Sequence, residues 1–242
     1  RWGLGAKALL TEKPDLIYCS ISGFGRIGPL ADRAANDLIV QAYSGLLSFT
    51  GEPGRPPVRC ATAISDFSAG LHAALGILAA VIHRFRTGKG QEVTTSMLES
   101  QIGMMNYFFA EYWLLDVVPK PMGTANRLGM PNQAFPTQDG WVVITAANDR
   151  MWERCCRALG APEMAFDERF ATLGRRYENR DVLVEAISKM TRQRSTRELL
   201  EALDHEGVSC GPILTVPEVA DDEQVKELGL VKEVDRGDGG TS

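Results

Sequence analysis

A long apolar helix built largely from small residues is the feature that most constrains this fold. We predict it for residues 68–86, where alanine and glycine are mixed with leucine and isoleucine. Small side chains allow a sheet or another helix to approach closely. A compact apolar strand is predicted before it, at residues 15–22, and a second strand after it, at residues 91–95. This order of strand, helix and strand favours an α/β fold with a parallel sheet.

The pattern changes near Asp116, where Val117-Val118-Pro119-Lys120-Pro121 is typical of a linker. Beyond it, residues 132–146 fit a hairpin that turns at Gln138-Asp139-Gly140. A helix is predicted at residues 196–205. We therefore expect four segments: part of a large α/β domain at 1–115, a linker at 116–122, a smaller α+β domain at 123–222, and a second linker at 223–242 that returns towards the large domain.

Composition excludes several classes of partner. With 26 Lys and Arg against 31 Asp and Glu, the net charge of −5 argues against a nucleic-acid groove or an anionic membrane surface. The five cysteines are odd in number and contain no C-x-x-C pair, so we expect no metal, no disulfide framework and a cytoplasmic protein. The longest apolar run, residues 71–82, is shorter than the about 20 residues that cross a bilayer, and we expect it to be buried.

The ends of the chain indicate a fragment or an incompletely ordered chain. It begins with Arg1-Trp2-Gly3, without an initiator methionine or a signal peptide, and its last residues contain no closing element. We therefore expect that part of a larger protein is missing from these residues, and activity of this chain alone is an open question.

Gly23-Phe24-Gly25-Arg26-Ile27-Gly28 matches the G-x-G-x-x-G pattern of dinucleotide-binding sites and follows a predicted strand. Its context does not fit that interpretation. Pro29 follows at once, no long amphipathic helix is predicted next, and the acidic residue about 20 positions further on, Glu52, lies in a Pro/Gly-rich loop. We interpret the glycines as a turn that needs their conformational freedom, and a nicotinamide or flavin enzyme as the least favoured alternative.

Several motifs together resemble the family III CoA-transferases, the group of formyl-CoA and carnitine-CoA transferases. No single motif is decisive, but their order and spacing cover most of the chain. They are Arg1-x-Gly3-Leu4-Gly5, Pro14 to Gly25, Asn36-Asp37-Leu38-Ile39 with Thr50-Gly51, Asp66-x-x-x-Gly70, Arg84-x-x-Thr87-Gly88-Lys89-Gly90-Gln91, Ala134-Phe135-x-Thr137-x-Asp139-Gly140, and Gly211-Pro212-Ile213 ahead of Val216-Pro217.

The resemblance implies a Rossmann-like large domain with an inserted smaller α+β domain, in an interlaced homodimer. It implies transfer of CoA from an acyl-CoA to a small carboxylic acid, with coenzyme A as substrate and no tightly bound cofactor or metal. The identities of the donor and the acceptor stay open, because one methylene changes binding by only about 1–3 kcal/mol.

Asp66 is the residue that the resemblance identifies as the nucleophile. By analogy with the family, its carboxylate attacks the acyl-CoA thioester and forms a mixed anhydride, and an aspartyl-CoA thioester follows. We expect it just ahead of a helix that starts near Ser68, whose N-terminus favours the charged carboxylate. The alternative is that Asp66, or Ser65, merely caps this helix.

The resemblance also implies a CoA-binding segment. Arg1 corresponds to an arginine that contacts the CoA nucleotide, although a solvated terminal charge is the alternative. Ala34, Ala35, Asn36 and Asp37 match a segment that lines the site. Formyl-CoA transferases have a lysine in place of Ala34, so a phosphate contact is lost here or shifted to Arg33. Asp37 matches an acidic active-site residue, and a helix cap is its alternative.

Gly129 lies where formyl-CoA transferases have a polyglycine loop over the active site. A single glycine among residues 127–133 predicts a stiffer loop and argues against formyl-CoA as substrate. Two alternative functions are an α-methylacyl-CoA racemase and an inactive CoA-binding domain. Such racemases use a His-Asp pair where this chain has Asn36-Asp37, and asparagine cannot serve as the proton-transfer base.

Overall fold

The computed structural model describes residues 3–232 and residue 234. The chain divides into two compact units, residues 1–123 and 124–242. The predicted linker, residues 116–122, lies at the end of the first unit. Both units combine helices with a small sheet, so the predicted mixture of α and β structure is confirmed.

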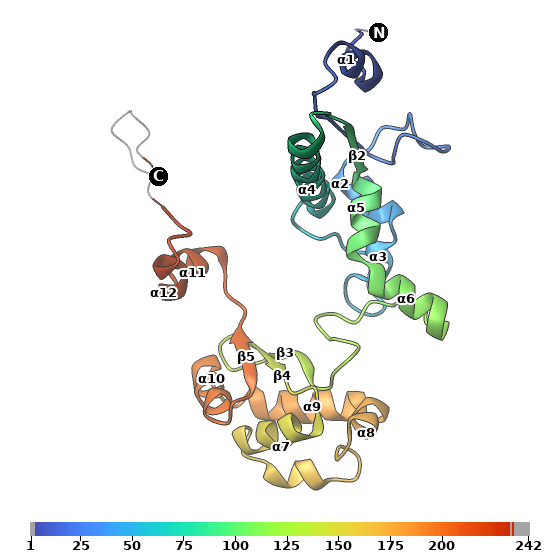
Figure 1. The fold of residues 1–242 in the computed structure, drawn as a ribbon. Coiled ribbons are helices and arrows are strands. Elements are labelled where there is room, and N and C mark those ends of the chain that lie inside the picture. Colours follow the sequence, from blue (N-terminus) through green and yellow to red (C-terminus); the bar gives the residue numbers. More distant parts are fainter. Residues whose placement is uncertain (1–2, 233, 235–242) are drawn as a thin grey trace. The chain divides into compact units, whose positions relative to one another are not determined.

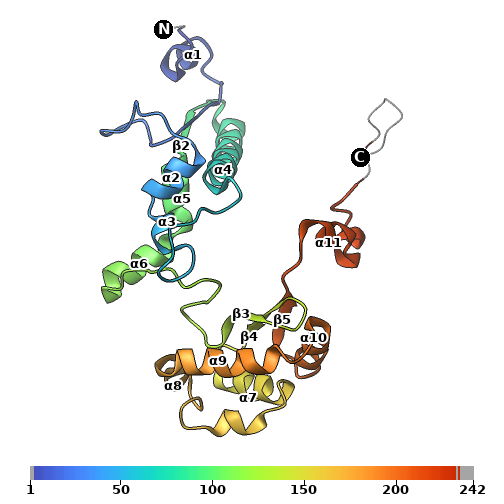
Figure 2. The same ribbon diagram turned by 180° about the vertical axis from the view of Figure 1, so that it is seen from behind.

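The first unit is an α/β arrangement (Figure 1). Its elements are α1 (Ala6–Glu12), β1 (Tyr18–Ser22), α2 (Asp37–Tyr43), α3 (Leu46–Phe49), α4 (Ile64–Thr87), β2 (Glu92–Ser96), α5 (Met97–Met104) and α6 (Asn106–Leu115). β1 and β2 pair in parallel, with Tyr18 opposite Glu92 and Ser22 opposite Ser96. The predicted strand, helix and parallel strand are therefore confirmed. α4 runs alongside both strands and packs on α5 (Figures 1 and 2).

The small side chains of α4 form its buried face. Ala69, Ala73 and Ala80 are buried, and a Cβ placed on Gly76 would lie only 2.6 Å from Cγ1 of Val93 in β2. The expectation that residues 71–82 are buried is wrong for the large side chains, because close packing through the small residues turns the large ones outward. The exposed large apolar side chains of α4 are Phe67, Leu71, Leu75, Leu78, Ile82 and Phe85.

Among the described residues, α4 is the one helix long and apolar enough to cross a membrane, judged by length and composition. It is longer than the predicted 68–86 because it begins at Ile64. Within the first unit its small face contacts β1, β2, α2 and α5.

The second unit is built on a three-stranded antiparallel sheet. Its elements are β3 (Asn132–Pro136), β4 (Trp141–Thr145), α7 (Asp149–Ala158), the 3₁₀ helix η1 (Pro162–Phe166), α8 (Leu173–Glu178), α9 (Arg180–Thr191), α10 (Thr196–His205), β5 (Ser209–Pro212), α11 (Val216–Asp221) and α12 (Glu223–Glu227). The predicted hairpin is confirmed, with Asn132 opposite Thr145 and Pro136 opposite Trp141. β5 joins the other edge of β4.

Helices α9 and α10 pack on this sheet. Both views show α7 on the same side of the sheet as α9 and farther from the strands (Figures 1 and 2). The core of the unit is large and contains Phe135, Ile144, Trp152, Leu183 and Leu199, each fully buried. The first unit has a much smaller cluster of buried apolar residues around Val40, Ala69 and Met97. The second unit therefore contains most of the fully buried large apolar side chains.

One predicted linker is partly helical. Within residues 223–242, which we expected to be a linker, Glu223–Glu227 form α12. The side chain of Asp222 accepts a hydrogen bond from the Val225 amide at 3.1 Å, which caps this helix at its first turn.

Candidate active site

Asp66 lies inside the first turn of α4, not ahead of it. The helix begins at Ile64 and its N-cap is Ala63, whose side chain makes no capping hydrogen bond. The alternative that Asp66 or Ser65 caps the helix is therefore wrong. The Asp66 side chain is exposed and borders an open depression with Ala63, Phe67, Gly70 and Leu71. A negative charge at this position is stabilised by the helix N-terminus.

Asp37 provides the cap that the local sequence lacks. Its Oδ1 accepts the backbone N–H of Ser65 at 3.0 Å, from a position 28 residues earlier in the chain. Its Oδ2 accepts a hydrogen bond from Gln41 Nε2 at 2.7 Å. The structure thus brings Asp37 to the helix end that carries Asp66. The alternative role predicted for Asp37, a helix cap, is confirmed. The helix that it caps is α4 and not α2, in which Asp37 itself lies.

Buried polar side chains surround this contact. Gln41 and Ser65 are fully buried, and Gln101 is 2% exposed. Gln41 accepts the Cys60 N–H at 2.9 Å and also faces the Cys60 carbonyl at 3.3 Å. Ser65 Oγ donates to Gln101 Oε1 of α5 at 3.0 Å. The residue before Asp66 is therefore held from α2 through its backbone and from α5 through its side chain.

The predicted CoA-binding segment leads directly into α2. Asn36 is the N-cap of this helix, and its Oδ1 accepts the Ile39 N–H at 3.0 Å. The guanidinium of Arg33 lies 5.9 Å from the centre of the Phe24 ring. Ala34 is exposed, and Ala35 is half-buried. Arg1 lies outside the described residues.

The glycine-rich segment after β1 packs against this region. Gly25 and Gly28 have φ angles of 99° and 88°, which other residues rarely adopt. A Cβ on Gly23 would lie 2.3 Å from the Cβ of Ala35. Residues 23–36 form bends and turns without a helix, so the helix that a dinucleotide-binding motif requires is missing. The interpretation of this pattern as a turn is confirmed.

Gly23→Ala is expected to lower the free energy of unfolding by about 1–3 kcal/mol, because the new methyl group overlaps Ala35. The control is Gly103→Ala in α5, where a Cβ would meet nothing within 4 Å. That change is expected to stabilise the helix by up to about 1 kcal/mol. Urea unfolding of both variants measures the difference, and equal stability of the two would contradict the close approach of Gly23 and Ala35.

Gly129 belongs to the second unit, where its segment is held in place. The backbone of Gly129 is buried, and a Cβ there would lie 2.6 Å from the Cβ of Ala147. Two side chains of α8 bind the same segment: Arg176 Nε donates to the Met130 carbonyl at 2.7 Å, and the Tyr177 hydroxyl donates to the Arg127 carbonyl. The stiffer loop expected from its single glycine stays a prediction.

Sequence reasoning missed the residues that hold these segments. Gln41 and Gln101 lie 25 or more positions away from Asp66, and nothing in their local sequence distinguishes them from exposed polar residues of a helix. Arg176 follows another arginine in a short polar helix, a pattern typical of a surface. The roles of these three residues become visible only from their tertiary contacts.

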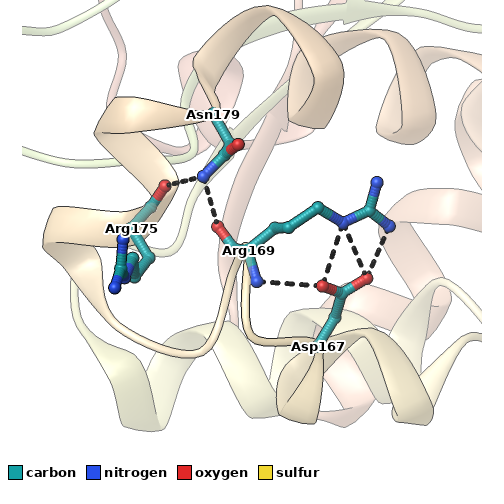
Figure 3. A network of polar contacts seen from close by, with 4 residues as sticks. All are labelled: Asp167, Arg169, Arg175 and Asn179. Carbon is teal, nitrogen blue, oxygen red and sulfur yellow. Dashed lines mark hydrogen bonds and ion pairs between the residues drawn. The ribbon is translucent and has the colours of Figure 1, made fainter.

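A depression in the second unit is lined by Glu168, Arg169, Ala171, Thr172, Arg175 and Asn179. Figure 3 shows the polar contacts among four residues at this place, Asp167, Arg169, Arg175 and Asn179. Arg169 donates to Asp167 through Nη2 at 2.6 Å and through Nε, and this hydrogen bonding lowers the pKa of Asp167 to about 2. Asn179 Nδ2 donates hydrogen bonds to the backbone carbonyls of Arg169 and Arg175. Arg175 pairs with Glu178. Because both arginines are already paired with carboxylates, this network stabilises the turn and is a poor candidate for binding an anionic substrate.

Comparison with known proteins points to one family. The family model described as CoA-transferase family III matches residues 1–242. The chain is 36% identical over 239 residues to the succinate–glutarate CoA-transferase of Agrobacterium fabrum, covering 99% of this chain and 60% of that protein. It is 34% identical over 233 residues to the succinyl-CoA:glutarate CoA-transferase of Homo sapiens, covering 96% of this chain and 53% of that protein.

The fold has close structural relatives as well. A crystal structure of a CAIB/BAIF family protein from Brucella suis superimposes with a TM-score of 0.84 at 37% sequence identity. The match covers 96% of this chain and 61% of the Brucella chain. The chain thus spans a little more than half of the length of the relatives that it matches.

Proposed function

The chain belongs to CoA-transferase family III, and we propose that the protein that carries it moves CoA from an acyl-CoA to a free carboxylic acid. The observation that carries this proposal is the exposed carboxylate of Asp66 in the first turn of α4, next to a residue fixed by buried hydrogen bonds. Its relatives are named for succinate and glutarate, so we propose small dicarboxylic acids as the substrate class.

The proposed reaction starts with attack of an Asp66 oxygen on the thioester carbonyl. CoA leaves as the thiolate, and an anhydride joins the acyl group to Asp66. The thiolate then attacks the Asp66 carbonyl, which gives aspartyl-CoA and releases the donor acid. The acceptor carboxylate attacks this thioester and expels the thiolate again. Attack of the thiolate on the acceptor carbonyl of the second anhydride completes acceptor-CoA and restores Asp66.

Each addition creates an oxyanion that needs hydrogen-bond donors. At the start of α4 the N–H groups of Ile64 and Ser65 already donate to Thr62 and Asp37. We therefore propose the N–H of Asp66, which has no partner within the helix, as a donor. For the CoA moiety we propose Arg1 and the segment Arg33, Ala34, Ala35 and Asn36 as the contact surface, with Asp37 in the same site. The family resemblance adds Gly129 as a further candidate CoA-binding residue. The proposal extends to a cytoplasmic homodimer with a Rossmann-like large domain.

Transfer of a labelled oxygen tests this mechanism in the full-length protein. In the proposed sequence, the oxygen that joins Asp66 to the acceptor comes from the acceptor and stays on Asp66. After a single turnover with succinyl-CoA and glutarate labelled with heavy oxygen, mass spectrometry should find one heavy oxygen in the peptide that contains Asp66, and repeated turnover should label its second oxygen as well. Glutaryl-CoA formed without label on that peptide would overturn the covalent role of Asp66. Absence of CoA transfer from succinyl-CoA to any small dicarboxylic acid would overturn the proposed function.

A further inference from the structure

Both carboxylate oxygens of Asp37 are used by donors within the protein. Oδ1 faces the N–H of Ser65 at 3.0 Å, and Oδ2 faces Nε2 of Gln41 at 2.7 Å. A backbone N–H can only donate. Gln41 accepts the Cys60 N–H through Oε1 at 2.9 Å, so its other amide atom, which faces Asp37, is the donor nitrogen.

This arrangement does not suit a group that transfers protons. A general acid or base must reach the proton that it gives or takes. Neither of the two contacts of Asp37 offers an acceptor to which a carboxylic acid could donate a proton. It does suit an ionised carboxylate at a helix N-terminus, because charged hydrogen bonds to backbone amides are strong and the helix dipole favours the negative charge.

We infer that Asp37 is a positioning residue that sets the place of Asp66 by capping α4 from outside the helix. The inference rests on the proposed function of Asp66. Gln41 holds Asp37 by bridging it to the Cys60 backbone, and Gln101 holds the Ser65 side chain from the opposite element, α5. Ala63, the N-cap of α4, offers no side-chain acceptor. Among the described residues, Asp37 is therefore the one whose side chain accepts a backbone N–H from the first turn of α4.

The consequence for catalysis is geometric. Asp66 follows directly after Ser65, so loss of the Asp37 contact frees the turn that carries the nucleophile. A displacement of about 1 Å at a reacting group can lower the rate by about 100-fold. The effect should fall on kcat, with little change in KM, because CoA contacts elsewhere in the site are unaffected.

Two substitutions separate positioning from chemistry. Asp37→Asn keeps an oxygen that can accept the Ser65 N–H, but it has no carboxylate. Asp37→Ala removes the acceptor. In the full-length protein with succinyl-CoA and glutarate, we expect Asp37→Asn to stay within about tenfold of the wild-type kcat, since it loses one hydrogen bond from Gln41. Asp37→Ala should lose about 100-fold in kcat. Asp32→Asn and Asp32→Ala, at an exposed neighbouring residue, are the controls.

Hydrogen exchange of residues 64–68 supplies a measurement independent of activity. Exchange should accelerate in Asp37→Ala and stay near wild type in Asp37→Asn. The acidic limb of the pH profile of kcat should be the same in Asp37→Asn and wild type.

Three results would overturn the inference: Asp37→Asn as inactive as Asp37→Ala, Asp37→Ala with wild-type kcat, or unchanged exchange in Asp37→Ala. If Asp37→Ala does not fold, Asp37→Asn decides alone: retained activity with an unchanged acidic limb supports positioning, and a folded, inactive variant overturns it. If the wild type transfers no CoA, the proposed function fails and the functional inference falls with it, while hydrogen exchange still decides whether Asp37 caps α4.

Discussion

Replacing Asp66 by alanine is expected to lower the kcat for CoA transfer by roughly a thousandfold or more, because the proposed covalent path passes through this carboxylate at every step. The fold should survive the change. Asp66 is exposed, and loss of a charge near a helix N-terminus costs only about 0.3–1 kcal/mol. The rate of glutaryl-CoA formation from succinyl-CoA measures the effect in the wild type and in Asp66→Ala. Thermal unfolding of both proteins should show that their stabilities are about equal.

Matched variants sharpen this result. Asp66→Asn keeps the shape of the side chain but lacks the nucleophilic carboxylate, so it should be as inactive as Asp66→Ala. Asp32→Ala removes an exposed acid at the surface of the same unit and should keep wild-type activity. Full activity of Asp66→Ala, or failure of hydroxylamine to trap the wild-type residue in the presence of acyl-CoA, would contradict the assignment.

Arg176→Met is expected to lower the free energy of unfolding of the second unit by about 2–6 kcal/mol, because two buried carbonyls lose their donor at a cost of about 1–3 kcal/mol each. Arg176 is fully buried. Its guanidinium donates to the carbonyls of Met130 and Phe170 at 2.7 and 3.0 Å and to Asp149 at 2.8 Å. Methionine fills similar space but leaves the two carbonyls without these donors.

The adjacent residue supplies the control. Arg175 is exposed and pairs with Glu178 on the surface of the same helix, so Arg175→Met should change stability by no more than about 1 kcal/mol. Urea unfolding followed by the fluorescence of Trp152, which is fully buried in this unit, reports both variants. If Arg176→Met were as stable as Arg175→Met, the buried contacts of Arg176 would not contribute to stability.

The hairpin and helix α10 show what local signals can predict. Gln138-Asp139-Gly140 marks the turn between β3 and β4, and the strands on either side pair as expected. The predicted bounds of α10, residues 196–205, agree with the structure because Ser195 and Glu198 form a capping box at its start. In both cases the deciding contacts join residues that lie within a few positions of one another.

The start of α4 shows where such prediction fails. Local rules look for a polar cap next to the helix, and they placed the first turn near Ser68, after Asp66. The helix starts at Ile64 because Asp37 supplies the missing acceptor from 28 positions away. The same limit applies to Arg176, which is buried by segments that lie up to 46 positions from it in the chain.

The sequence by itself determined the family, the mixed α/β class, the parallel type of the first sheet, the β3–β4 hairpin and the identity of Asp66 as the candidate nucleophile. Motif order and short-range hydrogen bonds carry that information. Only the tertiary structure decided where α4 begins, that Asp37 lies at the helix end that carries Asp66, and that Arg176 and Tyr177 hold the segment around Gly129. Those outcomes depend on buried polar groups finding partners far away in the chain, and no local pattern specifies such partners.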